Sequence, residues 1–354
     1  MRNGKICVGI VGAGHITNQR HIPNFREAGA EVVALADVVE GRAARMAAKW
    51  DIPHAFTDYR EMLALPEIDA ISICVPPFVH KEVALAAFEA GKHVYLEKPP
   101  AMNEAEMIEI VKAGRQAGKL LMAGSNSVYW NRTQALKKMI DAGDLGEIYL
   151  VKSLGAGRRN IPRGWFRIKR LAGGGVGMDG GSHTIDRILY LLNTPKPVSV
   201  IAQTYDKFAD YVPKASYLAI DIEEGTQTDV PRADVEDTVV AFIQFDNGCT
   251  FVMENAWAAN TSGGGGTWLY GTKAGASLTP FTIYGETPQG ILTDITPVVP
   301  EGPQTHVEAL SHFVTCIREG RETESPGERS IVTMRILDAI YKSASMGGRE
   351  IRLD

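Results

Sequence analysis

A glycine-rich turn near the N-terminus has the residue types that bind a dinucleotide. Gly12 and Gly14 follow a short apolar run, and a helical pattern begins at about residue 15. We expect Gly12 to form the tight turn and Gly14 to let the backbone approach a pyrophosphate, whose charge the helix amides and dipole favour. The cofactor-binding prediction therefore covers Gly12 and Gly14 and the next two residues, His15 and Ile16.

Two more residues bear on this nucleotide signal. Thr17 replaces the third glycine of the G-x-G-x-x-G pattern, at a position where helix packs on strand and a small residue is tolerated. Asp37 ends the second apolar run, twenty residues beyond Thr17, where a carboxylate can bind the adenosine ribose diol. An ordinary strand–helix turn is the alternative interpretation.

Asp37 also indicates which dinucleotide is bound. Its charge would repel a 2′-phosphate, and the neighbouring Val38 offers neither a hydroxyl nor a cation, so NAD is favoured and NADP stays possible. Arg42 could pair with that phosphate or stack on adenine, and it could equally belong to a solvated helix face.

Three other side chains could move a proton. Asp179 and His183 are four residues apart, so on a helix they share one face, and an imidazole has an ordinary pKa near 6.5. Lys98 follows an apolar run, where a strand end would put its ammonium beside a ligand of an α/β sheet. Such an ammonium could polarise a carbonyl oxygen and lower the pKa of an alcohol.

Each of these three residues has a less specific interpretation. Lys98 could be a strand-end lysine paired with a surface acid, and His183 a helix histidine with its hydrogen bonds satisfied. Asp179 and His183 could also hold a metal ion, which would do the work of the lysine. No convincing third ligand is visible in the sequence, so we predict no metal.

The pattern of the first third predicts a parallel sheet that positions these residues. Short apolar runs alternate with helical patterns of 10–15 residues, which is typical of crossover units and a helix-covered sheet. We expect strands at 6–11, 31–36, 70–75, 93–96 and 120–124 and helices at 15–28, 39–50, 79–90 and 104–117.

The pattern changes after about residue 125. Two β-rich segments, 238–245 and 249–257, are joined by Asp246, Asn247 and Gly248, which is a hairpin signal. We also expect helices at 133–142, 307–318 and 330–345, a strand at 147–154 and further β segments to about residue 284. The predicted fold is α/β with a Rossmann domain at 1–125, followed at 126–354 by an α+β domain on a largely antiparallel sheet, with the last helices free to pack on either domain.

Two further segments complete a pattern that resembles the glucose–fructose oxidoreductase/inositol dehydrogenase/MocA family over essentially the whole chain. The first has VPPFVH at 75–80 and GKHVYLEKP at 91–99, and the second has GGGVGMDGGSHTID at 173–186. The resemblance implies a C-terminal domain whose large open sheet often forms homodimers or homotetramers. It implies reversible oxidation of a secondary alcohol, usually on a sugar, cyclitol or sugar derivative.

The resemblance also implies roles for individual residues. Lys98 and His183 would be the acid/base pair, and Asp179 would orient the substrate or His183. Glu97 and Lys98 belong to the Glu-Lys-Pro element. The positions that match the nicotinamide half of the family's cofactor site are Pro76, His80, Glu97 and Asn126.

The segment 155–175 has six cations and no acid. It is either a solvated basic loop or a lid that closes over the cofactor or an anionic substrate group. Tyr129, Trp165 and Arg167 are the candidate substrate contacts, together with Asn126, because aromatic faces and hydrogen-bonding groups suit a polyol. Each of them could instead be packing.

Composition narrows the classes of partner. The net charge of −5 argues against a nucleic-acid binder, and the segment without charges at 255–272 is too rich in Gly, Asn, Thr and Ser to span a membrane. Four well-separated cysteines and the lack of an apolar signal core after Met1 favour a cytoplasmic protein with reduced thiols.

We weigh three functions. The leading one is NAD-dependent interconversion of an alcohol and a ketone. The second is redox-assisted glycoside cleavage, in which oxidation at C3 acidifies the neighbouring C–H, a glycosidic group is eliminated and the hydride returns. The third is a non-catalytic dinucleotide-binding regulator, which would be expected to lack Lys98 and His183.

Overall fold

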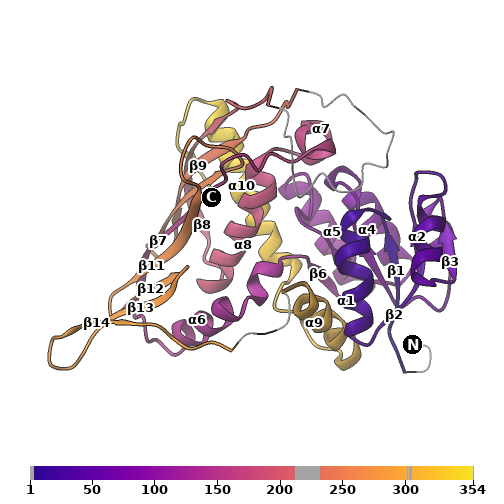
Figure 1. Cartoon of the computed structure of the whole chain (residues 1–354), viewed down its shortest axis with the longest axis horizontal. Coiled ribbons are helices and arrows are strands. Elements are labelled where there is room, and N and C mark those ends of the chain that lie inside the picture. The colour runs from indigo at the N-terminus through magenta and orange to yellow at the C-terminus, as the bar shows by residue number, and fades with distance from the viewer. Residues whose placement is uncertain (1–3, 212–231, 301, 303–304, 354) are drawn as a thin grey trace. The chain divides into compact units, whose positions relative to one another are not determined.

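The chain divides into two compact units, coloured by residue number in Figure 1. The computed structural model describes residues 4–211, 232–300, 302 and 305–353. Residues 1–3, which precede the first expected strand, lie outside the described residues. The first unit comprises Met1–Tyr129 and Pro303–Ile331, and the second comprises Trp130–Gly302 and Val332–Asp354. The predicted boundary at 125/126 lies four residues before the end of the first segment.

The first unit is built on a parallel sheet. Within the described residues it has six strands in the order β3-β2-β1-β4-β5-β6, so the order reverses between β1 and β4. This is the Rossmann arrangement, in which ligands bind outside the carboxyl ends of the strands at the reversal. The strands are β1 (Cys7–Val11), β2 (Glu31–Ala36), β3 (His54–Phe56), β4 (Ala70–Ile73), β5 (His93–Leu96) and β6 (Leu121–Ala123).

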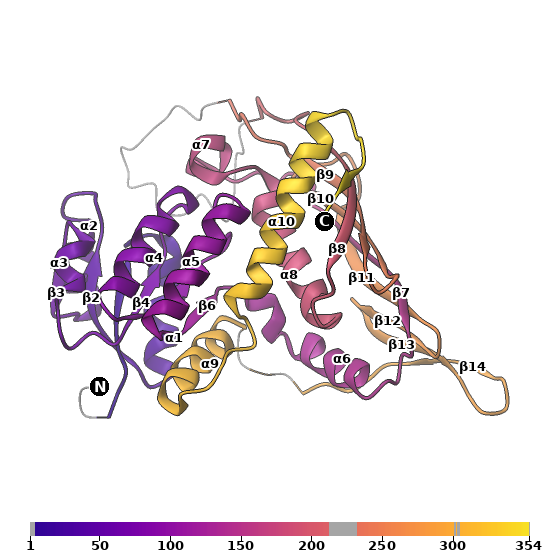
Figure 2. The same ribbon diagram turned by 180° about the vertical axis from the view of Figure 1, so that it is seen from behind.

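Helices cover both faces of this sheet. Comparison of Figures 1 and 2 shows α1 on one face and α4 and α5 on the other, and α9 packs against α1. Strands β1, β2, β4, β5 and β6 are almost wholly buried, which explains their continuous apolar runs, whereas the edge strand β3 is partly exposed. The helices are α1 (Ile22–Glu27), α2 (Arg42–Trp50), α3 (Tyr59–Leu63), α4 (His80–Glu89), α5 (Glu104–Ala117) and α9 (Thr305–Glu319).

Local sequence fixes both ends of α5. The Asn103 side chain accepts a hydrogen bond from the Glu106 amide at 2.9 Å, and the Glu106 carboxylate accepts one from the Met102 amide at 3.1 Å. Gly118 then ends α5 with a φ of 61°. These are the N-terminal capping and C-terminal glycine signals of a stable helix.

The second unit is built on a larger sheet. In the described part of the chain it has nine strands, ordered β14-β13-β12-β11-β7-β10-β9-β8-β15, and every pair is antiparallel except β7 with β10. The predicted α/β fold class with a second, mostly antiparallel sheet is therefore confirmed. The strands are β7 (Ile148–Ala156), β8 (Pro197–Tyr205), β9 (Thr238–Phe245), β10 (Thr250–Ala256), β11 (Gly264–Gly271), β12 (Gly275–Leu278), β13 (Phe281–Glu286), β14 (Leu292–Ile295) and β15 (Ile351–Arg352).

Helices lie along one face of this second sheet, as both views show. They are α6 (Asn131–Asp141), α8 (Ser182–Leu191) and α10 (Gly327–Ser345), and the short α7 (Lys169–Ala172) precedes α8. The predicted hairpin is present, because β9 and β10 pair antiparallel across Gly248, which has a φ of 83°.

Several details differ from the sequence predictions. Strands β8, β14 and β15 were not predicted. The short β3 and α3 were not predicted, because three strand residues carry too little periodicity. The helix expected from residue 39 begins at Arg42, after Gly41 with a φ of 72°. The helix expected at 15–28 contains a π-helical segment, Thr17–His21, before α1.

Candidate active site

The carboxyl edge of the parallel sheet collects the predicted cofactor residues. Gly12 follows β1, Asp37 follows β2, Pro76 lies beyond β4, Glu97 follows β5 and Asn126 lies beyond β6. Because parallel strands end at the same edge, residues far apart in the sequence come to one side of the first unit.

The two glycines of the turn face different surroundings. Gly12 has a φ of 98°, and a Cβ there would lie 2.4 Å from the carbonyl oxygen of Cys74, so only glycine fits. A Cβ at Gly14 would meet no atom within 4 Å. The backbone at Gly14 therefore borders open space at the start of the helix, next to half-buried His15 and Ile16, as close approach of a pyrophosphate requires.

Thr17 and Asp37 brace this turn. Thr17 is buried, and its hydroxyl donates to the Gly12 carbonyl at 2.5 Å, so the residue in place of the third glycine closes the turn with its side chain. Asp37 accepts from the Ala13 amide at 2.8 Å, and the Arg42 guanidinium lies 3.4 Å from its other oxygen. Arg42 is thus beside Asp37 at the adenosine end of the expected cofactor path.

His80, a predicted cofactor residue, contacts two loops of this unit. It is fully buried, with Nε2 2.8 Å from the Val75 carbonyl oxygen and Nδ1 3.3 Å from that of Pro100. Burial lowers the pKa of His80, and the carbonyl oxygens of Val75 and Pro100 act in the opposite direction. The imidazole thus lies between the loops that follow β4 and β5. Pro76, on the first of these loops, is half-buried and extended.

Glu97 holds a buried ion pair beside Lys98. Its Oε1 lies 2.8 Å from Nε2 of His21, and its Oε2 accepts from the Lys98 amide at 3.1 Å. Burial raises the pKa of Glu97, but the hydrogen bond and charge of His21 outweigh burial and lower it to about 2. Burial lowers the pKa of His21, but Cys74 and Glu97 outweigh it and raise the value to about 10. The backbone of Lys98 is thus anchored to an ionised carboxylate at the end of β5.

A second imidazole joins this edge from the C-terminal part of the chain. The Asn126 amide nitrogen is 2.9 Å from Nε2 of His306, at the start of α9. Burial lowers the pKa of His306, which also interacts with the charges of Glu97 and Lys98. Tyr129, a candidate substrate contact, is buried instead against the ring of His312, at 5.4 Å between centroids.

The second unit carries the other predicted acid/base residues. Asp179 lies in a π-helical segment, Gly177–Gly181, that leads directly into α8, and His183 is the second residue of α8. The Trp257 indole donates to Oδ2 of Asp179 at 2.9 Å. Asp179 and His183 are both half-buried. A tryptophan that the sequence did not single out therefore fixes the carboxylate four residues before His183.

Two arginines of the basic segment contact backbone carbonyls of their own unit. Arg167 is 1% exposed, and its guanidinium donates to the carbonyls of Ala209 at 2.7 Å and Tyr211 at 2.9 Å. Arg159 donates to the Ala259 carbonyl at 3.2 Å. Trp165 stacks on the next residue and stays half-buried. These contacts give Arg167 a structural role.

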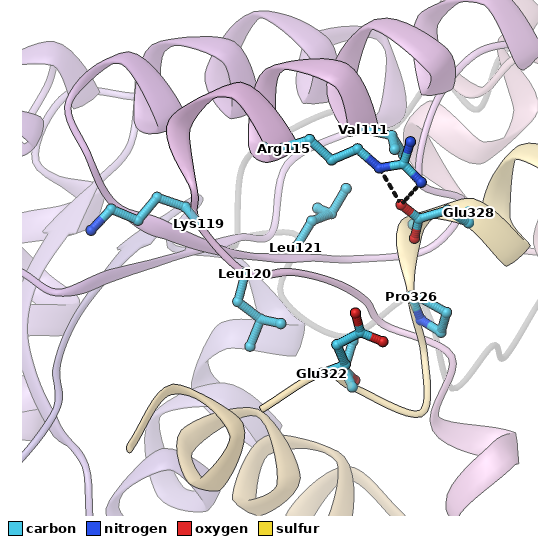
Figure 3. Close-up of a pocket in the computed structure, with 11 residues that line it drawn as sticks. Val111, Arg115, Lys119, Leu120, Leu121, Glu322, Pro326 and Glu328 are labelled. Carbon is cyan, nitrogen blue, oxygen red and sulfur yellow. Dashed lines mark hydrogen bonds and ion pairs between the residues drawn. The ribbon is translucent and has the colours of Figure 1, made fainter. Parts of the chain in front are cut away.

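Two cavities among the described residues lie away from the predicted site residues. One of about 480 Å³ lies around Leu120 and Leu121 in the first unit, where Arg115 and Glu328 pair (Figure 3). It borders the start of β6, at the sheet edge opposite Lys98. Another, of about 500 Å³, borders Glu236 in the second unit.

Two absences hold for the residues that the structure describes. No group of three or more His, Cys, Asp or Glu side chains is arranged to hold a metal ion. No helix in the same part of the chain combines the length and apolarity needed to cross a bilayer.

Comparisons with known proteins agree with this architecture. The profile of the Gfo/Idh/MocA oxidoreductases with an NAD-binding Rossmann fold matches residues 6–125, and that of the Gfo/Idh/MocA C-terminal domain matches 133–277. A putative UDP-kanosamine synthase oxidoreductase subunit of Amycolatopsis mediterranei (strain S699) is 33% identical over 71% of this chain and 68% of its own. The chain belongs to the Gfo/Idh/MocA family.

Other Gfo/Idh/MocA relatives extend over nearly the whole chain. The D-glucoside 3-dehydrogenase of Escherichia coli (strain K12) is 28% identical over 99% of this chain and 98% of its own length. A structure of levoglucosan dehydrogenase in complex with NADH has a TM-score of 0.83 at 21% identity and covers 99% of both chains, which shows the shared fold. This Gfo/Idh/MocA protein is therefore an NAD-binding oxidoreductase.

The first unit fits the NAD of the family. Gly12 and Gly14 form a turn with open space beside it, and Asp37 stands at the end of β2. Sequence reasoning missed His21 and His306, since nothing local distinguishes them from other helix histidines. It also missed Trp257, whose role depends on the fold of β10 and the turn after it.

Proposed function

We propose that this chain interconverts a secondary alcohol and a ketone on a sugar, cyclitol or sugar derivative, with Lys98 and His183 as its acid/base pair. The observation that carries the proposal is the anchoring of Lys98 at the carboxyl end of β5 among the dinucleotide residues. The two dehydrogenases just described act, by their names, on a glucoside and on levoglucosan, which supports a carbohydrate substrate.

In the first unit Gly12, Gly14, His15 and Ile16 would hold the pyrophosphate, and Asp37 the ribose diol. Pro76, His80, Glu97 and Asn126 would surround the nicotinamide half, and His80 and Glu97 do so by fixing loops. NAD, when bound, supplies the hydride acceptor. NADP would meet the charge of Asp37, although Arg42 stands close enough to offer a partial counter-charge.

Oxidation of an alcohol leaves a proton on its oxygen. We assign His183 to accept that proton and Lys98 to stabilise the developing charge on the same oxygen with its ammonium. Asp179, held by Trp257, would orient His183 or a substrate hydroxyl. Trp165 is proposed to supply an aromatic face for the sugar. Tyr129 and Arg167 fit packing better, because both are buried.

An NAD-reduction screen against cyclitols, aldoses, uronates and glycosides tests the activity. The Lys98→Met, His183→Asn double variant should abolish turnover and keep NAD binding by calorimetry. Lys81→Met with His54→Asn makes the same replacements at half-buried ion pairs away from the proposed site and should keep turnover. Unaltered turnover in the first double variant would remove the catalytic assignment.

Redox-assisted glycoside cleavage is the second candidate. It is favoured by the similarity to a D-glucoside 3-dehydrogenase, since oxidation at C3 is the first step of that chemistry. Release of a free aglycone without accumulation of NADH would support it. Stoichiometric NADH with an intact glycosidic bond would support the simple dehydrogenase.

We also propose that the chain forms a homodimer or homotetramer through the outer face of its large sheet. Ile201 and Phe242 are paired across β8 and β9, and with Val240 they expose apolar side chains on that face. Sedimentation of the wild-type chain should give a dimer or tetramer, and Phe242→Glu a monomer. A monomeric wild-type chain would contradict this.

A further inference from the structure

The glycine-rich segment before α8 is held by a single residue 59–61 positions away. Glu236 is 8% exposed, and its Oε2 and Oε1 accept hydrogen bonds from the amides of Gly175 and Gly177, each at 2.9 Å. Its carbonyl oxygen accepts from the Val176 amide at 3.2 Å. Three successive amides of the segment are therefore satisfied by Glu236.

The glycines are what this close approach requires. A Cβ at Gly175 would lie 1.8 Å from the Glu236 carbonyl oxygen, and one at Gly174 would lie 2.1 Å from the hydroxyl oxygen of Tyr341. Gly177 is also close, with a Cβ position 2.8 Å from that hydroxyl. Tyr341 itself donates to Oε1 of Glu236 at 2.8 Å. The backbone of the segment can therefore pack this closely against Glu236 and Tyr341 only because these positions are glycine.

The segment held in this way leads into the predicted acid/base residues. The Asp179 amide donates to the Gly175 carbonyl at 3.0 Å, and His183 follows one turn later. The next residue after Glu236 holds the other side of the site, because the Trp257 amide donates to the Asp237 carbonyl at 2.8 Å. One short stretch thus sets both the backbone of Asp179 and the tryptophan that holds its carboxylate.

We propose that Glu236, with Tyr341 as its hydrogen-bond donor, is a positioning residue that sets the direction in which Asp179 and His183 project from the start of α8. The inference rests on the proposed function for the roles of those two side chains. A reacting group displaced by about 1 Å can lose on the order of 10²-fold in rate, so an anchor of this kind is worth more to turnover than to stability.

The test compares Glu236→Gln with the wild-type chain. The amide nitrogen of glutamine cannot accept from a backbone N–H, so one of the two anchoring hydrogen bonds becomes a donor facing a donor. We expect kcat to fall about 10²-fold with the KM for NAD unchanged. The Trp257 indole resonance, assigned by its absence in Trp257→Phe, should move in the ¹H–¹⁵N spectrum of uniformly labelled protein.

Two further variants keep the test decisive. Tyr341→Phe removes only one donor to the carboxylate and should give a smaller fall in kcat and a smaller indole shift, even if Glu236→Gln fails to fold. Ser343→Ala, on the same helix, removes a buried hydroxyl that accepts from the Ala202 amide at 2.9 Å. It should lower the melting temperature and leave both kcat and the indole resonance unchanged.

The outcomes separate the two proposals. A fall in kcat with an unmoved indole resonance, or a moved resonance with full kcat, overturns the positioning role. A moved resonance in Glu236→Gln, combined with no turnover of any polyol by the wild-type chain, overturns the proposed function and supports the positioning of Asp179.

Discussion

His21 and Glu97 lie 76 residues apart in sequence and form an ion pair with 2.8 Å between Nε2 and Oε1. The imidazole is fully buried, and its Nδ1 lies 2.9 Å from the Ser72 hydroxyl. Since Glu97 also accepts from the Lys98 amide, the pair connects the first helical segment with the strand end that presents the proposed catalytic lysine.

Glu97→Gln should destabilise the first unit by about 3–5 kcal/mol, because it leaves His21 buried without its counter-charge. Urea unfolding followed by circular dichroism measures this. A His21→Gln, Glu97→Gln double variant should lose less than the sum of the two single variants, and strict additivity would show that the pair is not coupled.

The ion pair should also give the unfolding free energy a defined pH dependence. The pKa of His21 is raised to about 10, so its contribution is complete below its ordinary value of 6.5 and is lost as the pH rises toward 10. The pKa of Glu97 is lowered to about 2, so its contribution is complete above 4.5 and is lost as the pH falls toward 2. The advantage of the wild-type chain over the double variant should therefore be greatest between pH 4.5 and 6.5. A difference that stays constant from pH 2 to pH 10, with no decline below pH 4.5 or above pH 6.5, would contradict the pairing.

Gly12→Ala and Gly14→Ala should separate folding from cofactor binding. A Cβ at position 12 would lie 2.4 Å from the Cys74 carbonyl oxygen, at a φ of 98°, so Gly12→Ala should lower the melting temperature markedly. Position 14 has open space, and Gly14→Ala should melt like the wild type and bind NAD at least about tenfold more weakly. Differential scanning fluorimetry and calorimetric titration with NAD test both. Unchanged NAD affinity in Gly14→Ala would contradict the proposal that the pyrophosphate binds at this turn.

Asp37→Ser should reduce the preference for NAD. It removes the proposed acceptor for the ribose diol, a charge-assisted hydrogen bond of about 1.5–3 kcal/mol, so the KM for NAD should rise at least about tenfold relative to that for NADP. Arg42→Ala is the companion variant. The Arg42 side chain is 41% exposed, so we expect its loss to change the unfolding free energy by less than about 1 kcal/mol. An unchanged cofactor ratio in Asp37→Ser would count against the ribose assignment.

Arg167→Met tests whether this arginine supports the fold or the substrate. Its guanidinium satisfies the carbonyls of Ala209 and Tyr211, so the variant should lose about 1–3 kcal/mol of unfolding free energy. The KM for the substrate, measured well below the melting temperature, tests the alternative that Arg167 contacts the substrate. A raised KM for the substrate without a loss of unfolding free energy would support a substrate-binding role for Arg167.

Much of the fold could be predicted because its signals are local. Apolar runs of strand length, helical patterns between them and the turn at Asp246 to Gly248 each arise from neighbouring residues. Segments with too few residues to show a period, such as His54–Phe56, could not be found in this way.

The sequence by itself determined that a glycine turn follows the first strand of a crossover fold and an acidic residue follows the second. Because parallel strands end at one edge of a sheet, it also determined that these residues lie at the same edge. Only the tertiary structure decided which side chains hold the other proposed site segments in place. His21 meets Glu97, His306 meets Asn126 and Glu236 meets Gly175, across 76, 180 and 61 residues. No local pattern encodes such pairs, because a buried polar group bonds to whichever partner lies beside it in the folded chain. Which distant residues lie side by side is set by the packing of helices and sheets.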